Sequence, residues 1–119
     1  MNTEKRKLVL ERELKRILNI ISSQYKPEKV ILFGSLATGR ITDTSDIDLF
    51  IIKDTSLRYL DRVDEVRKLV HTMEAVDIFV VTPKEVEDAQ KENNPYLQEI
   101  FDEGKICYEQ TNKRLDKIC

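Results

Sequence analysis

Three aspartates occupy positions where a buried strand normally carries apolar residues. Asp46 and Asp48 open the run DIDLFII, and Asp77 is the second residue of the run VDIFVV. In an extended strand, Asp46 and Asp48 point to the same face with their Cα atoms about 6.6 Å apart. Taking isolated carboxylates out of water costs free energy, and clustered negative charges also repel one another. The pattern therefore predicts that a positive group lies among these three side chains.

Oxygen ligands without a nearby histidine or cysteine select a hard divalent cation, usually Mg²⁺, and Mn²⁺ can replace it. Two such ions about 3.5–4 Å apart would be bridged by Asp46 and Asp48, with Asp77 completing the coordination of one ion. The alternative is that the three residues are strand-end aspartates facing solvent. A D-x-D pair followed by a third aspartate on a second apolar strand favours the metal site.

A second group of candidate residues precedes the aspartate pair. The segment LFGSLATGR places Gly34 and Ser35 directly after an apolar run. A helical turn that begins there would aim free backbone N–H groups and the Ser35 hydroxyl at a phosphate. Gly34 and Gly39 have the glycine spacing of a Walker A motif, but Arg40 and Ile41 stand where that motif has Lys and Ser/Thr. Because those two positions contact the phosphates and the metal, we reject a P-loop.

The apolar pattern changes period along the chain and indicates the elements that position these residues. Continuous apolar runs predict strands over 30–33, 46–52, 76–81 and 106–108. Helical spacing predicts two amphipathic helices, whose apolar stripes are Leu10, Leu14, Ile17, Leu18 and Ile21, and Leu60, Val63, Val66 and Val70. The first helix ends before Pro27. The alternation of helices and strands predicts an α/β (α+β) sheet with helices packed against it.

Two further helices are expected between the third and fourth strands. A charged, weakly amphipathic segment follows Pro83. The next helix is better marked, with Asn94 as N-cap and Pro95 in the first helical position. Gly104 is expected as the left-handed residue past its end.

Size and composition narrow the class of protein. The chain has 119 residues, 40% hydrophobic and 35% charged, with 20 Lys+Arg against 22 Asp+Glu. We expect one domain over 1–109 and a polar tail over 110–119. A formal net charge of -2 excludes a polybasic arm and does not support general nucleic-acid binding. The N-terminus lacks a signal-peptide core and no run approaches about 18 apolar residues, so we expect a cytoplasmic protein without a membrane role.

Cysteine and histidine usage argues against a disulfide and against zinc. Cys107 lies in the last predicted strand and Cys119 ends the tail, and we expect both as free thiols. One histidine and two widely separated cysteines offer no zinc-ligand spacing. The histidine, His71, is expected at the surface near a helix end.

The order Gly34-Ser35, ten residues, then Asp46-x-Asp48 resembles the G-S-x10-D-x-D signature of the DNA polymerase β-like nucleotidyltransferase superfamily. Asp77 matches the third carboxylate of that superfamily on a later strand. The resemblance is strongest over 29–82 and extends through residue 108. The short chain resembles the minimal nucleotidyltransferases, which are the antitoxin halves of prokaryotic HEPN/MNT toxin–antitoxin pairs.

This resemblance implies a mixed sheet packed against helices, and a role for each candidate residue. Gly34 and Ser35 would hold the β and γ phosphates of ATP, the nucleotide substrate. Asp46 and Asp48 would hold two Mg²⁺ ions, and Asp77 would help to hold the ion that activates an attacking hydroxyl. The products would be pyrophosphate and a nucleotidylated acceptor.

One departure from the pattern concerns basic residues. Positions 36 and 38, often basic in relatives, are Leu36 and Thr38 in this chain. Arg40 is the candidate that supplies the missing positive charge to the nucleotide.

The predicted elements use most of the chain, so we expect the acceptor to be presented by another chain or another copy. The resemblance implies a HEPN toxin ribonuclease whose tyrosine hydroxyl receives AMP. The chain is not itself that toxin, because the spacing from Arg67 to His71 is shorter than in the R-x-H motif of HEPN proteins. Two alternatives remain open. One is a non-catalytic antitoxin that occludes its partner, and the other is an antibiotic-type transferase of small molecules, which would need a homodimer or an appended domain.

Overall fold

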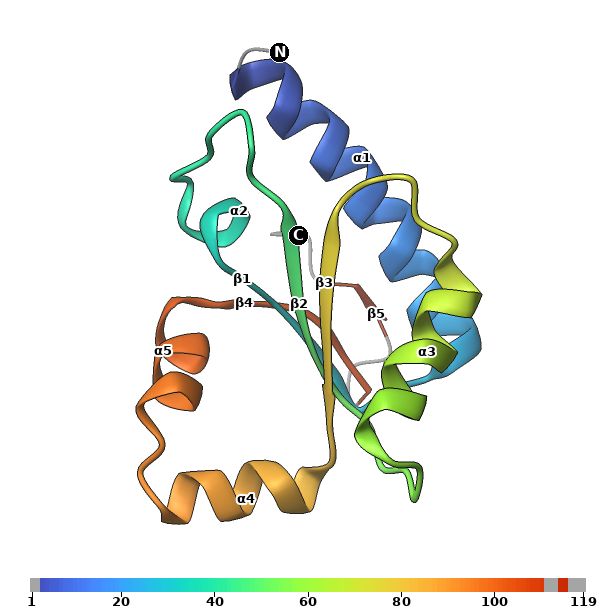
Figure 1. The fold of residues 1–119 in the computed structure, drawn as a ribbon, viewed down its shortest axis with the longest axis vertical. Helices are drawn as coiled ribbons and strands as arrows, with labels where there is room; N and C mark the ends of the chain where they lie inside the picture. The colour runs from blue at the N-terminus through green and yellow to red at the C-terminus, as the bar shows by residue number, and fades with distance from the viewer. Residues whose placement is uncertain (1–2, 111–113, 116–119) are drawn as a thin grey trace.

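A computed structural model describes residues 3–110 and 114–115. In chain order its elements are α1 (Thr3–Ile20), a π-helical turn η1 (Ile21–Tyr25), β1 (Lys29–Phe33), α2 (Ser35–Thr38), β2 (Ile47–Ile52), α3 (Tyr59–Val70), β3 (Val76–Val81), α4 (Pro83–Lys91), α5 (Pro95–Glu103), β4 (Lys105–Glu109) and β5 (Arg114–Leu115) (Figure 1). The predicted order of helices and strands is confirmed. The structure adds η1 and β5, and it confirms a helical turn directly after Gly34.

The strands of the described chain form one mixed sheet in the order β3-β2-β1-β4-β5. β1 pairs antiparallel with β2 and with β4, whereas β2 and β3 run parallel. A parallel pair requires a crossover connection, and α3 supplies it. In this register Asp48 of β2 lies beside Asp77 of β3 on one side and Phe33 of β1 on the other.

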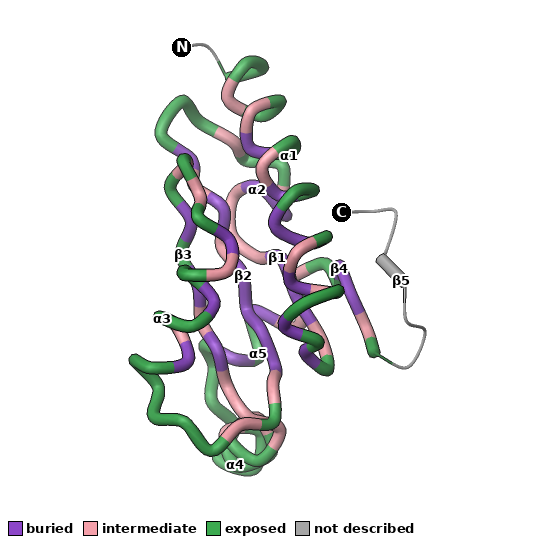
Figure 2. Tube along the Cα trace, turned by 90° about the vertical axis from the view of Figure 1, so that its right-hand side faces the viewer, coloured by how far each residue is buried: buried purple, intermediate pink, exposed green. Residues whose placement is uncertain are grey.

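Helices cover the two faces of the sheet unequally. α1 and α3 pack on one face, over a large core that includes Leu14, Val66 and Leu49. α4 and α5 lie toward the other face, where a smaller core includes Phe50 and Ile100 (Figure 1). The central strands are buried along most of their length, whereas α4 has no buried residue (Figure 2). Since side chains alternate along a strand, Asp48, the second residue of β2, shares the face of Phe50.

The first helix matches its predicted stripe and, together with η1, ends before Pro27 as predicted. α1 spans 18 residues and buries Leu10, Leu14, Ile17 and Leu18. It continues into η1 and stops at Lys26, whose φ of 55° is left-handed, directly before Pro27. Within the described ranges, none of the helices has the length and hydropathy needed to cross a membrane.

The stripe predicted for α3 is wrong at its first position. Leu60 is 79% exposed, whereas Val66 and Val70 are fully buried. The first turn of α3 instead turns Arg62 inward, and its guanidinium donates to the carbonyl oxygens of Leu57 at 2.7 Å and of Val80 at 3.2 Å. At the start of α3 the buried residue is therefore Arg62, whose hydrogen bonds to backbone carbonyls compensate for its burial, and not Leu60 as the apolar period predicted.

The N-cap predicted for α5 is confirmed, whereas the left-handed conformation predicted for Gly104 after its end is wrong. Asn94 is the N-cap, because its Oδ1 accepts from the backbone N–H of Tyr96 at 2.9 Å. Gly104 is not left-handed, since its φ is -74°. A Cβ on Gly104 would overlap the Ile100 carbonyl and the Ile31 side chain, so glycine is required by the close packing of α5 on β1.

A short strand lies within the segment that was predicted as a polar tail. Arg114–Leu115 form β5, which pairs antiparallel with the last two residues of β4. Cys107 is fully buried in β4 and is disulfide-bonded, so the expectation of a free thiol is wrong at this position. Cys119 lies outside the described residues. The return of the chain along β4 is a tertiary feature that the spacing of the cysteines does not reveal.

Candidate active site

The structure brings Asp48 and Asp77 together on adjacent parallel strands. Asp48 is half-buried and Asp77 is exposed. Burial raises the pKa of Asp48, and together with the charge of Asp77, a hydrogen bond to Asp77 and the charge of Asp46 it brings that pKa to about 6. The site therefore concentrates negative charge in a partly desolvated place, as the sequence pattern predicts.

The Asp48 side chain packs directly against Gly34. Its φ of 75° and ψ of -160° lie where side chains are strained, and a Cβ at this position would overlap Asp48 Oδ2. α2 begins at the next residue, and the Gly34 carbonyl accepts from the N–H groups of Ala37 and Thr38, each at 3.1 Å. The N–H groups of Ser35 and Leu36 belong to the first turn and have no partner within the helix.

Ser45 connects the Gly34-Ser35 turn to the strand that carries Asp48. The Ser35 hydroxyl donates to Ser45 Oγ at 2.9 Å, and the Thr42 backbone N–H donates to the same oxygen at 2.8 Å. Ser45 is only 7% exposed. Sequence reasoning missed this residue, because a serine in a connecting segment carries no signal beyond its place before the D-x-D pair.

Asp46 lies outside the strand that was predicted to include it. β2 begins at Ile47, so Asp46 directly precedes the strand that carries Asp48. The Asp46 Oδ1 atom lies 3.8 Å from Arg6 Nη2, and its side chain is 41% exposed. Arg6 of α1 is thus a positive group beside one of the three aspartates, and the sequence analysis did not identify it.

The donor set fits a hard divalent cation by chemistry, although it is not assembled into a coordination shell. Asp48 and Asp77 supply carboxylate oxygens and their mutual repulsion favours a bound cation. Within residues 3–110, no three His, Cys, Asp or Glu side chains converge closely enough to hold a metal ion. The charge of Asp46 also acts on Asp48, since it is among the causes that raise the pKa of that carboxyl.

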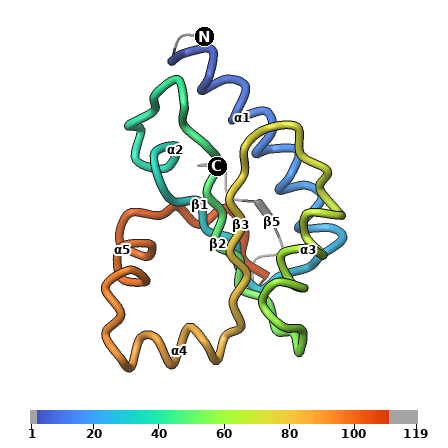
Figure 3. The backbone as a smooth tube through the Cα atoms, viewed as in Figure 1, coloured from blue at the N-terminus to red at the C-terminus, as the bar shows by residue number. Residues whose placement is uncertain are grey.

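The remaining sequence candidates lie at the edge of the site. Arg40 is exposed immediately after Gly39, in the connection that leads from α2 to β2 (Figure 3). Leu36 is 8% exposed and belongs to the core, so position 36 serves packing in this chain. His71 is exposed and ends α3 with a left-handed φ of 43°, as expected of a surface residue at a helix end.

A cavity of about 210 Å³ opens beside Gly34. Its lining comes from β1 and α5 and consists of Phe33, Gly34, Tyr96, Glu99, Ile100 and Glu103. The Phe33 ring also packs against Phe79, with ring centroids 5.7 Å apart. The site therefore has open space next to Gly34, bounded by the Phe33 ring and by α5, which brings Glu99 and Glu103 to the lining.

A glycine-serine turn before a short helix, facing carboxylates on neighbouring strands and a mixed sheet together define a nucleotidyltransferase. Residues 15–113 match the family model described as "Polymerase beta, Nucleotidyltransferase". The chain belongs to this family of nucleotidyltransferases, and the fold class and resemblance inferred from its sequence are confirmed.

Relatives and solved structures agree with this assignment. A protein of Methanocaldococcus jannaschii named "Putative protein adenylyltransferase MJ0604" is 32% identical over 100 residues, which cover 82% of this chain and 97% of that protein. A crystal structure of a "putative nucleotidyltransferase from Sulfolobus solfataricus" is similar at a TM-score of 0.68 and 21% identity, covering 97% of this chain and 93% of that one. A structure described as "the toxin-antitoxin with AMP-PNP" is similar at a TM-score of 0.58 and 22% identity, covering 83% and 76%.

Proposed function

We propose that this chain is a Mg²⁺-dependent protein adenylyltransferase that modifies a tyrosine of a partner HEPN toxin and so acts as its antitoxin. The observation that carries the proposal is the pair of neighbouring carboxylates, Asp48 and Asp77, with Asp48 packed against Gly34. The name of the Methanocaldococcus relative supports protein adenylylation. In this proposal residues 1–109 are one catalytic domain, which acts in the cytoplasm within a hetero-oligomer or a homodimer.

The proposal gives each candidate residue a part in binding ATP. Gly34 and Ser35 hold the β and γ phosphates, because the N–H groups at the start of α2 are suited to anionic oxygens and the Ser35 hydroxyl would turn from Ser45 to donate to a phosphate. Arg40 approaches the phosphates from the solvent side. The cavity beside Gly34 leaves room for further parts of the nucleotide.

Asp46, Asp48 and Asp77 are the residues that would hold two Mg²⁺ ions, or Mn²⁺ in their place. When bound, these ions supply positive charge to the triphosphate and lower the pKa of the acceptor hydroxyl. Asp48 and Asp77 present oxygen donors on the open part of the sheet, where ATP and the acceptor can meet. Asp77 is exposed, and in this proposal the partner protein approaches the site from its side.

In the reaction the acceptor oxygen forms a bond to the α-phosphorus of ATP. The bond from that phosphorus to the oxygen bridging the α and β phosphates breaks, and pyrophosphate leaves with the bonding electron pair. The acceptor hydroxyl loses its proton to solvent. The chain's own contribution is to hold the reacting groups in place and to stabilise charge, which are the main sources of catalysis in phosphoryl-type transfers.

The two alternatives predict different behaviour of the carboxylates. An antitoxin that only occludes its partner has no use for Asp48, whose raised pKa shows that its charged form is held at a cost in stability. An antibiotic-type transferase would use the same carboxylates on a small hydroxyl compound. The carboxylate pair therefore favours an enzyme over an occluding module.

The test uses the purified chain, Mg²⁺ and the product of the neighbouring reading frame. With ATP labelled at the α-phosphate we expect label on a tyrosine of that partner, and with ATP labelled at the γ-phosphate we expect none. Asp48→Asn and Asp77→Asn should abolish labelling, whereas Asp54→Asn, an exposed aspartate outside the site, should not. If the two Asn variants neutralise the toxin as well as the parent does, the enzymatic account of antitoxin action is wrong.

A further inference from the structure

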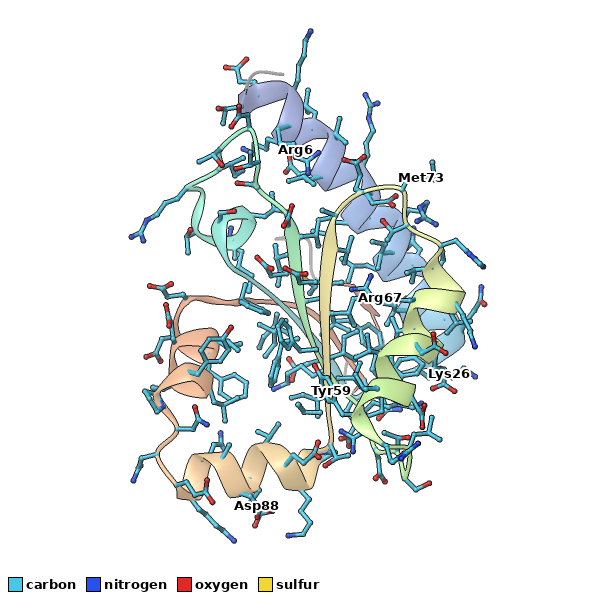
Figure 4. All side chains as sticks on the ribbon, in the orientation of Figure 1. Arg6, Lys26, Tyr59, Arg67, Met73 and Asp88 are labelled. Atoms are coloured by element: carbon cyan, nitrogen blue, oxygen red, sulfur yellow. The ribbon has the colours of Figure 1, made fainter. Side chains whose placement is uncertain are left out.

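One arginine of α1 joins the segments that precede both carboxylate-bearing strands. Arg6 Nε donates to the Ser45 carbonyl at 2.9 Å, and Arg6 Nη1 donates to Glu74 Oε1 at 2.7 Å. Arg6 Nη2 lies 3.8 Å from Asp46 Oδ1. The Arg6 side chain is only 15% exposed, and Figure 4 shows Arg6 on the N-terminal part of α1.

Both hydrogen bonds end beside the candidate active site. Ser45 immediately precedes Asp46, and its hydroxyl already holds Ser35. Glu74 lies in the connection from α3 to β3, three residues before Asp77. The guanidinium thus ties the segment leading into β2 to the segment leading into β3.

A second contact from α1 holds the same connection. Glu13 accepts hydrogen bonds from the Thr72 hydroxyl and from the Met73 backbone N–H. The connection leading to β3 is therefore held to α1 at two places, at Glu13 and at Arg6. Its position relative to the sheet depends on α1 and not only on strand pairing.

We propose that Arg6 is a positioning residue that sets Asp46 in place relative to Asp48 and Asp77, and so determines the affinity of the site for divalent cations. This inference rests on the proposed function, because it takes the three aspartates as the cation site. The contact of Arg6 with Asp46 is longer than its two hydrogen bonds, at 3.8 Å against 2.9 and 2.7 Å. Arg6 therefore leaves the Asp46 carboxylate free to bind a cation.

Charge and geometry identify positioning as the role of Arg6. Glu74 neutralises much of the guanidinium charge, which reduces the repulsion of an incoming cation. The planar fork of arginine reaches the Ser45 carbonyl and the Glu74 carboxylate together, whereas a lysine has one terminal nitrogen for both. Simple electrostatics predicts that removal of Arg6 tightens cation binding. Loss of positioning predicts the opposite, so the two effects differ in sign.

The experiment measures Mn²⁺ binding by calorimetry without nucleotide or partner, and the Mg²⁺ concentration that gives half-maximal labelling. We expect Arg6→Gln to raise the Mn²⁺ dissociation constant about 10–100-fold, as is typical when a residue supporting metal ligands is lost. Arg6→Lys should restore only part of the affinity. Arg12→Gln, an exposed arginine of the same helix, should bind Mn²⁺ like the parent.

Each outcome separates the inference from the proposed function. If the parent neither binds Mn²⁺ nor labels a partner, the proposed function fails. If the parent does both and Arg6→Gln binds Mn²⁺ as tightly as the parent or more tightly, only the role of Arg6 is wrong, even if thermal stability falls. Should Arg6→Gln not fold, Arg6→Lys keeps the positive charge but has one terminal nitrogen, and it must still weaken Mn²⁺ binding relative to the parent for the inference to stand.

Discussion

Replacing Asp48 by asparagine should stabilise the cation-free protein while it abolishes catalysis. Asp48 lies beside Asp77 and above Gly34, and its pKa of about 6 compares with an ordinary value of 3.8. A pKa difference of about 2 corresponds to about 3 kcal/mol between the charged and neutral forms. Because Asp48 is only half-buried, solvent screening reduces this to about 1–2 kcal/mol. For a domain of this size we expect the melting temperature to rise by about 3–10 °C.

The sign of the pH dependence follows from the raised pKa. The folded protein binds the Asp48 proton more tightly than the unfolded chain does, so this contribution to stability is complete below about pH 4 and is lost as pH rises through 6. The amide side chain of the Asp48→Asn variant does not titrate. This variant should therefore exceed the parent in stability above pH 6, and the difference should shrink toward zero as pH falls to about 4.

The assay is thermal unfolding in EDTA between pH 4.5 and 8, with the exposed Asp54→Asn as control. Adding Mg²⁺ should raise the melting temperature of the parent, because a ligand that binds only the folded state stabilises it, and should raise that of Asp48→Asn less. If Asp48→Asn is no more stable than the parent at pH 8 in EDTA, the reasoning about carboxylate repulsion is refuted. A gain that does not change with pH would refute its attribution to the titration of Asp48.

Three further substitutions test single contacts. Gly34→Ala should cost more unfolding free energy than Gly39→Ala, because both have positive φ but only at Gly34 would a Cβ overlap Asp48. We expect about 1–2 kcal/mol for Gly39→Ala and at least 1 kcal/mol beyond that for Gly34→Ala, and equal losses in urea denaturation would contradict the close packing. Glu13→Gln should lose about 1–2 kcal/mol near neutral pH, because hydrogen bonds from Arg16 and Thr72 lower the pKa of Glu13 to about 2. That loss should vanish as pH falls from about 4.5 toward 2, and a loss independent of pH would contradict it. Tyr25→Phe should leave the unfolding free energy unchanged or raise it by up to about 1 kcal/mol, because the buried Tyr25 hydroxyl has no hydrogen-bond partner among the described residues. A clear drop in the denaturation midpoint would contradict this expectation.

Much of the fold was predictable because its signals are local. The third strand was predicted with the bounds that the structure has, Val76–Val81, because the first and last residues of the apolar run mark the ends of the strand. Asn94 was predicted as an N-cap because its side chain bonds to the next turn of its own helix. The prediction that Leu60 is buried was wrong. The helical period of the apolar residues shows that one face of a helix is buried, but it does not show which turns of the helix contact the sheet.

For the candidate site, too, some features were predictable from the sequence and others required the tertiary structure. The sequence by itself determined the chemistry, since the types and spacing of Gly34, Ser35 and the aspartates are enough to indicate a nucleotidyltransferase. Only the tertiary structure decided how these residues are held, because the hydrogen bonds of Arg6 reach across 39 residues to Ser45 and across 68 residues to Glu74. Such contacts depend on where α1 packs against the sheet. Spacing along a chain records which groups are available, whereas the packing of distant segments decides which of them meet.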